Sequence, residues 1–120
     1  MIDSFMNAVF RENQSPESII KNYMYVPFND TVSSKQKELF LGNAIDSLKK
    51  NNTKLVTSFA YKILSYTEFK GKKKLFSSSP EDIVIVAVRN KPVVYLYLNG
   101  DRIQSFTVFS KGKENYFLVI

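Results

Sequence analysis

Tyrosine is the residue type in this chain best suited to line a ligand site. The chain contains seven tyrosines, and Tyr95 and Tyr97 are two residues apart in an apolar run, which places them on one face of a strand. We predict a pocket lined by these two rings and by Tyr23 and Tyr61, with Asp30 in a loop over its mouth. A buried tyrosine packs by its ring and seeks a partner for its hydroxyl. Core packing or a subunit interface would therefore explain the same residues.

A cluster of lysines forms the second candidate site. Lys70, Lys72, Lys73 and Lys74 fall in one short loop and could bind phosphate or anionic lipid. The alternative is a solvated, charged turn. The net charge of +6 comes mostly from lysine rather than arginine, and no aromatic residues are interleaved with these lysines. The sequence therefore does not indicate nucleic acid as a partner.

Residues for catalysis or metal binding are scarce. The chain has no cysteine and no histidine, which excludes a thiol nucleophile, a histidine base, disulfides and a zinc site built from these ligands. Glu68 is the only acid in the strands we predict, and the four glycines are scattered singly rather than forming a phosphate-binding loop. We therefore predict no catalytic residue, no metal and no cofactor.

Length and composition indicate one globular domain spanning residues 1–120. The chain has a mass of 13.8 kDa and is 44% hydrophobic, values typical of a folded protein with a core. No apolar run approaches the roughly 20 residues of a membrane span. The first residues lack the basic region of a signal peptide. Cellular location stays open, including export as the mature part of a precursor whose leader lies outside this sequence.

Helix signals occupy the first half of the chain. Apolar residues recur every three or four positions over residues 2–12 and 16–24, which predicts two helices. Ser15, Pro16 and Glu17 form a strong start for the second of these. Ser33 and Gln36 form a capping box that begins a further helix, which we expect to end near Asn51 and Asn52.

Strand signals occupy the second half. Residues 53–69 alternate with period two, which predicts one long strand with its odd-numbered residues toward the core. Residues 84–88 and 93–98 are apolar on both faces, so we expect a central sheet that is covered twice. Asn99-Gly100 predicts a hairpin, and residues 106–109 predict a bulge.

Amphipathic N-terminal helices followed by a long strand and an antiparallel meander make an α+β arrangement. With the helix starts at 15–17 and 33–36 and the Asn99-Gly100 hairpin, this order resembles the cystatin-like cone of the nuclear-transport-factor-two-like superfamily, especially its small bacterial members, many of them exported lipoproteins. The resemblance implies two or three N-terminal helices packed on a strongly curved antiparallel sheet of four to six strands. It also implies a pocket at the mouth of the cone and dimers that pack sheet on sheet.

Three functional hypotheses follow. The first is a non-catalytic binding or protein-interaction protein, forming a homodimer through the apolar sheet face because a monomer should not expose such a face to water. The second is a small-molecule carrier or a ketosteroid-isomerase-like enzyme that uses the pocket. The resemblance implies acids on pocket-facing strands for such an enzyme, and this sequence has none there. The third is an anion-binding protein that uses the lysine loop.

Overall fold

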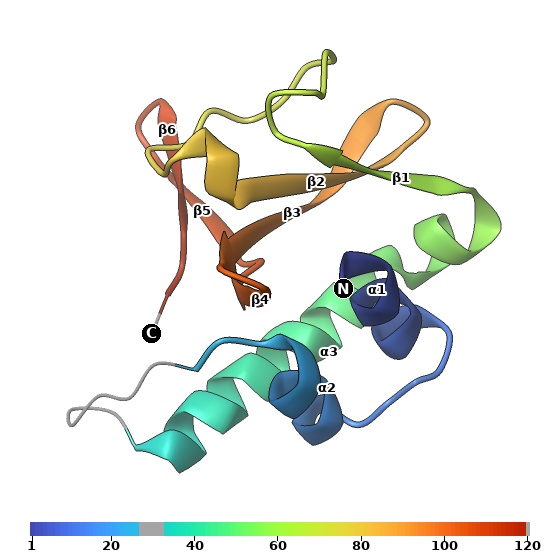
Figure 1. The fold of residues 1–120 in the computed structure, drawn as a ribbon, viewed down its shortest axis with the longest axis vertical. Coiled ribbons are helices and arrows are strands. Elements are labelled where there is room, and N and C mark those ends of the chain that lie inside the picture. Colours follow the sequence, from blue (N-terminus) through green and yellow to red (C-terminus); the bar gives the residue numbers. More distant parts are fainter. Residues whose placement is uncertain (27–32, 120) are drawn as a thin grey trace.

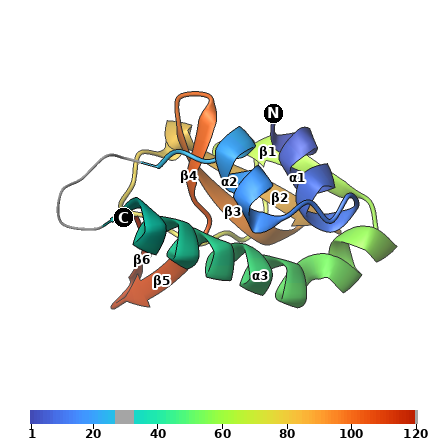
Figure 2. The same ribbon diagram turned by 90° about the horizontal axis from the view of Figure 1, so that it is seen from below.

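The structure, a computed structural model, describes residues 1–26 and 33–119. Within these residues three helices precede six strands, and the predicted α+β fold with N-terminal helices packed on a sheet is confirmed. The helices are α1 (Ile2–Phe10), α2 (Pro16–Tyr23) and α3 (Ser34–Ser58). All three lie on one side of the main sheet (Figure 1), and α3 runs alongside α1 and α2 (Figure 2).

Local capping fixes the starts of α2 and α3. The Ser15 hydroxyl accepts a hydrogen bond from the backbone N–H of Ser18, and Pro16 occupies the first helical position. At α3 the Ser33 hydroxyl accepts from the Gln36 N–H, and the Gln36 side chain accepts from the Ser33 N–H, which completes a capping box. Both predicted starts are confirmed.

The end of α3 differs from the prediction. The helix passes Asn51 and Asn52, which we expected to end it, and continues to Ser58. The long strand predicted over residues 53–69 is therefore wrong in its first part, and strand β1 comprises only Tyr61–Ser65.

Backbone bonding and packing explain why the last two turns of α3 are helical. The hydroxyl of Thr53 donates to the carbonyl of Lys49 at 2.5 Å, and that of Thr57 donates to the carbonyl of Thr53 at 2.6 Å. Such bonds to the preceding turn let threonine sit in a helix despite its preference for strands. Val56, two turns beyond Leu48, continues the buried stripe of the helix and is only 3% exposed. Core packing therefore outweighs the strand-like alternation.

The main sheet contains four antiparallel strands in the order β1-β2-β3-β4. After β1 and a short 3-10 turn at Pro80–Asp82, the remaining strands are β2 (Ile83–Val88), β3 (Lys91–Asn99) and β4 (Arg102–Ser105). Each pairs with the strand that precedes it among the four.

Tight turns connect these strands. Arg89 and Asn90 link β2 to β3, both with positive φ (53° and 63°), as a mirror-image hairpin turn requires. The predicted strand began at residue 93, whereas β3 begins at Lys91 and includes Pro92. The Asn99-Gly100 hairpin is confirmed, and the positive φ of Gly100 (61°) is one that glycine adopts at little cost.

The chain leaves the main sheet after Ser105. The bulge predicted at residues 106–109 is wrong, because β5 (Val108–Lys111) and β6 (Glu114–Phe117) form a separate two-stranded sheet. A bulge does occur slightly earlier, where Gln104 has no partner in the register between β3 and β4.

Two hydrophobic cores cover the two faces of the main sheet. The first lies against the helices and includes Phe5, Ile45 and Val86, each 0% exposed. The second lies on the opposite face, where β6 and the segment between β1 and β2 bury Ile85 and Tyr95. The prediction of a doubly covered sheet is confirmed, and one chain provides both covers.

Candidate functional site: a groove between the long helix and the edge of the sheet

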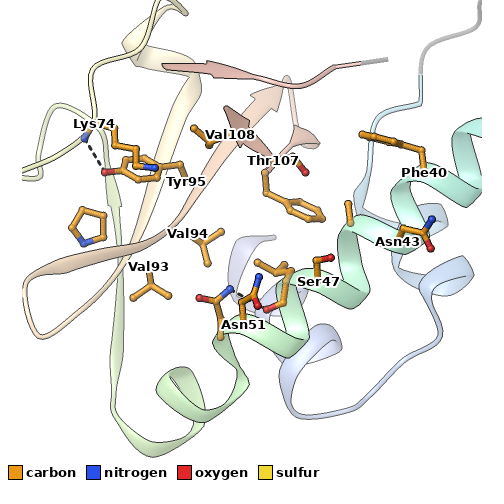
Figure 3. Close-up of a pocket in the computed structure, with 15 residues that line it drawn as sticks. Phe40, Asn43, Ser47, Asn51, Lys74, Val93, Val94, Tyr95, Thr107 and Val108 are labelled. Atoms are coloured by element: carbon orange, nitrogen blue, oxygen red, sulfur yellow. Dashed lines mark hydrogen bonds between the residues drawn. The ribbon is translucent and has the colours of Figure 1, made fainter. Parts of the chain in front are cut away.

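A groove of about 600 Å³ lies between α3 and the main sheet. We call it the α3–β3 groove (Figure 3). Three walls form it: one side of α3, the first half of β3, and the segment that leads from β4 to β5. The lining residues used below are Asn43, Ser47, Asn51, Lys74, Val93, Val94, Tyr95, Phe106 and Val108.

The helical wall presents neutral hydrogen-bonding groups beside apolar side chains of the same helix. Asn43, Ser47 and Asn51 follow one another at intervals of four residues, so they lie on one face of α3, and all three are exposed. The charged residues of this part of the helix, such as Asp46 and Lys50, do not line the groove. Amides and hydroxyls can both donate and accept, so this wall can bind uncharged polar groups.

The wall opposite is the unpaired edge of β3. Strand β4 pairs only with Tyr97, Leu98 and Asn99, because the chain turns away after Ser105. Among the described residues, no strand pairs with the first half of β3 on this side. Val93 and Val94 line the groove there, and Phe106 and Val108 add apolar surface from the departing segment. The open edge of β3 therefore lies between α3 and the segment that leads from β4 to β5, not at the outer rim of the molecule.

One end of the groove carries Tyr95 and Lys74. The backbone N–H of Lys74 donates to the Tyr95 hydroxyl at 2.9 Å, and the Tyr66 hydroxyl donates to the Lys74 carbonyl at 2.6 Å. Burial raises the pKa of Tyr95, although the hydrogen bond from Lys74 acts in the opposite direction. Tyr95 is therefore neutral at physiological pH. Lys74 is exposed, which places one positive charge at this end.

The groups that line the groove can bind a ligand by hydrogen bonds, apolar contact and one positive charge. The described lining residues include no carboxylate, so the groove has no acid to act as a general base. Nowhere in residues 1–26 and 33–119 do three or more acidic side chains gather in a way that could hold a metal ion. What the groove offers is a neutral polar wall, an apolar wall and one cation.

The structure does not bring the predicted pocket residues together. Tyr95 lines the groove. Tyr23 packs edge-on against Phe5 in the first core, Tyr61 donates to the Asp3 carboxylate at 3.3 Å, and Tyr97 stacks on Phe117. Asp30 lies outside the described residues.

The lysine loop divides into one structural lysine and three exposed ones. The ammonium group of Lys73 donates to the carbonyls of Tyr66 and Phe69 and lies 4.2 Å from the centre of the Tyr66 ring. The exposed ones are Lys70, Lys72 and Lys74. An anion-binding patch on this loop stays a prediction. The ammonium group of Lys73 already donates to backbone carbonyls of the chain.

A second groove, of about 670 Å³, lies beside the end of α2 and the start of α3. Arg102 lines it, but its guanidinium donates to the carbonyls of Lys21 and Met24 at 3.0 and 2.9 Å. Arg102 thus satisfies carbonyls at the C-terminal end of α2. Val26, the last described residue before residue 33, also lines this groove, and we base no site on it.

Comparison with known protein families, with curated proteins and with solved structures gives no match. Within the described residues, no helix is both long and apolar enough to cross a membrane. The case for a function therefore rests on the geometry of the α3–β3 groove.

The sequence analysis missed the polar residues of α3. Asn43, Ser47 and Asn51 attract no attention singly, because asparagine and serine are ordinary surface residues. Their signal is that three uncharged polar residues recur at every fourth position, on a different face of the helix from Asp46 and Lys50.

Proposed function

We propose that this protein is a non-catalytic binding protein whose ligand occupies the α3–β3 groove. The supporting observation is the pairing of an uncharged polar wall on α3 with an apolar wall on the sheet. Ligand sites commonly combine apolar surface with a few fixed polar groups. A helix face intended only for solvent would more often carry lysine and glutamate.

The test uses two tryptophan substitutions at neighbouring exposed positions of α3. Ser47→Trp places a large ring in the groove, whereas Asp46→Trp places the same ring outside it. The full chain, labelled with ¹⁵N, is titrated with a library of soluble small molecules and short peptides. We expect ligands to shift the amide signals of residues 43–52 and 92–95 in the wild type and in Asp46→Trp, but not in Ser47→Trp. Ligands that bind Ser47→Trp as well as the wild type would refute the proposal.

An enzyme that uses the same groove is the alternative from the sequence. No observation favours it, because the described residues that line the groove include no carboxylate, and the pKa of Tyr95 is raised rather than lowered toward neutrality.

We also propose kinship with the nuclear-transport-factor-two-like superfamily, with a bacterial origin. Helices that precede an antiparallel sheet, and a groove between helix and sheet, support this kinship. The separation of β5 and β6 into a second sheet is a feature that the resemblance did not lead us to expect. Export stays a prediction.

The homodimer also stays a prediction. Its original reason was an apolar sheet face without a cover, and β6 with the segment after β1 now covers that face. Light scattering of the full chain at micromolar concentration tests it, and a monomer would contradict it.

A further inference from the structure

We propose that the ligand of the α3–β3 groove is an extended peptide, which pairs with the free edge of β3 as an additional strand and places a carboxylate near Lys74. This inference rests on the proposed function and names its ligand class. Five features of the groove support it: the unpaired backbone of β3, the limited length of that edge, the spacing of the polar residues on α3, the charge of the lining, and the walls on both sides of the edge.

The backbone of Tyr95 is the first feature. Asn99 closes the two-residue turn against Arg102, so its N–H and C=O point toward β4. Backbone groups point to alternate sides along a strand. The register of β3 is unbroken from Tyr95 to Tyr97 against β2, and from Tyr97 to Asn99 the extra residue of the bulge lies in β4, not in β3. Tyr95 therefore points its N–H and C=O to the same side as Asn99, beyond the end of β4. These groups face the groove and can pair with an added strand.

The second feature limits the length of the pairing. The register of β3 shifts at Val93, and Pro92 has no N–H to donate. Bulges and prolines commonly protect an edge from pairing, and here they protect the end nearest the Arg89-Asn90 turn. The open part is the stretch around Tyr95, so a peptide would pair over three or four residues.

The third feature is that the polar side chains of α3 have nearly the same spacing as the backbone groups along one edge of an extended strand. Asn43, Ser47 and Asn51 repeat every four residues, which is about 6 Å along a helix. The groups on one edge of an extended peptide repeat every two residues, about 6.6 to 6.8 Å. A strand that pairs with Tyr95 on one edge can thus offer its other edge to these side chains in near register.

The fourth feature is charge. Lys74 is the one charged residue among the described residues that line the groove, and no acid lines it to compete. The chain as a whole carries a net charge of +6. An acidic side chain or the C-terminal carboxylate of a peptide complements this end of the groove.

The fifth feature argues against a second copy of this chain as the occupant. Neighbouring strands must approach to about 4.8 Å. The edge of β3 lies between α3 on one side and the segment of Phe106 and Val108 on the other. A single extended chain can enter between these walls, whereas the edge of a folded sheet, with its own side chains and cover, would meet them first.

The experiment begins with selection of random linear seven-residue peptides, displayed on phage, against the full chain. Selected peptides are synthesised and their dissociation constants measured by calorimetry. Each peptide nitrogen is then methylated in turn, which removes one N–H donor. We expect methylation of the positions whose N–H faces the backbone of β3 to weaken binding about tenfold or more. Methylation of the positions between them, whose N–H faces the exposed side chains of α3, should weaken binding less, by about threefold at most. This alternation is the signature of main-chain pairing along one edge.

Two sets of protein variants locate the peptide. Lys74→Ala should weaken binding of peptides that carry a carboxylate by about fivefold or more, whereas Lys72→Ala, in the same loop, should not. Ser47→Trp should abolish binding and Asp46→Trp should retain it. Asn51→Trp replaces Ser47→Trp as the blocking variant if circular dichroism shows that the latter does not fold.

The outcomes separate this inference from the proposed function. Ser47→Trp could abolish binding of the selected peptides while methylation weakens binding equally at every position. That result would overturn the strand pairing and leave the groove as a binding site. The selection could also yield no peptide whose binding Ser47→Trp abolishes, while an oligosaccharide or small molecule does bind in the groove. That result would overturn the assignment of a peptide as the ligand and leave the proposed function intact. Peptides that bind Ser47→Trp and wild type equally would overturn both.

Discussion

Lys73 should contribute to stability far more than the lysines beside it. Its ammonium group donates to the carbonyls of Tyr66 and Phe69, the latter at 3.0 Å, and lies over the Tyr66 ring. These contacts close the turn after β1, which brings Phe69 into the second core. Lys73→Met keeps an unbranched apolar stem over the ring but removes the charge and all three donors.

The expected loss follows from these contacts. A hydrogen bond that involves a charged group contributes roughly 1.5 to 3 kcal/mol, and a partly exposed cation–π contact about 0.5 to 1 kcal/mol. Because Lys73 is half-buried and water can reach its surroundings, we take the low end and expect about 2 kcal/mol. For a domain of this size 1 kcal/mol shifts Tm by roughly 4 °C, so Lys73→Met should melt about 8 °C lower.

Differential scanning calorimetry and urea denaturation at neutral pH measure the effect. Lys72→Met is the matched control, because Lys72 belongs to the same loop and is exposed. We expect its Tm to stay within about 2 °C of the wild type, as for most surface substitutions. Equal melting temperatures for the two variants would refute the role assigned to Lys73.

Three further predictions concern glycines and a buried tyrosine. Gly42→Ala should stabilise by roughly 0.5 to 1 kcal/mol, because a Cβ there meets only Pro16, at 3.7 Å, inside a helix; a lower Tm would contradict this. Gly71→Ala should destabilise by about 1 to 3 kcal/mol, since its Cβ would lie 2.9 Å from the Phe69 ring; an unchanged urea midpoint would contradict this. Burial raises the pKa of Tyr95, so its contribution is complete below its ordinary pKa of about 10 and is lost as the pH rises through the folded-state value. Tyr95→Phe should therefore lose less stability than the wild type above pH 10 in urea titrations, and identical pH profiles would argue against it.

The helix starts and the Asn99-Gly100 hairpin were predictable because each depends on a few neighbouring residues. Ser15 and Ser33 act on backbone groups within three residues of themselves. Gly100 takes a positive φ that glycine favours locally. Features of this kind need no knowledge of the rest of the fold.

The end of α3 was mispredicted because period two and helical packing compete over residues 53–58. Val56 decides the outcome, since it extends the buried stripe of α3 into a core that the sequence does not display.

The sequence did contain a local signal for the turn that follows β1. Ser65 and Glu68 have capping-box spacing, and the Ser65 N–H donates to the Glu68 carboxylate while the Glu68 N–H donates to the Ser65 hydroxyl. That pattern predicts a turn where we extended a strand.

The groove was not predictable, because its walls come from distant parts of the chain. Asn43 and Ser47 belong to α3, Val93 and Tyr95 to β3, and Val108 to the second sheet. Tyrosine drew attention by residue type, yet only Tyr95 of the four predicted tyrosines lies there. The open edge of β3 depends on where β4 ends, and the sequence suggested a bulge at that point instead of a departure.

The order of the two covers has a consequence for synthesis. The helices precede the sheet, so the first face of β2 and β3 is covered as soon as those strands form. Part of the second cover, the segment between β1 and β2, is also made early, but that cover is complete only with Phe117, which emerges from the ribosome 29 residues after Val88. At about 5 to 20 residues per second, roughly 1.5 to 6 seconds pass with Ile83, Ile85 and Ala87 incompletely covered and able to contact other nascent chains. Aggregation of this protein in cells should therefore respond to the translation rate of its last strands more than to that of its helices.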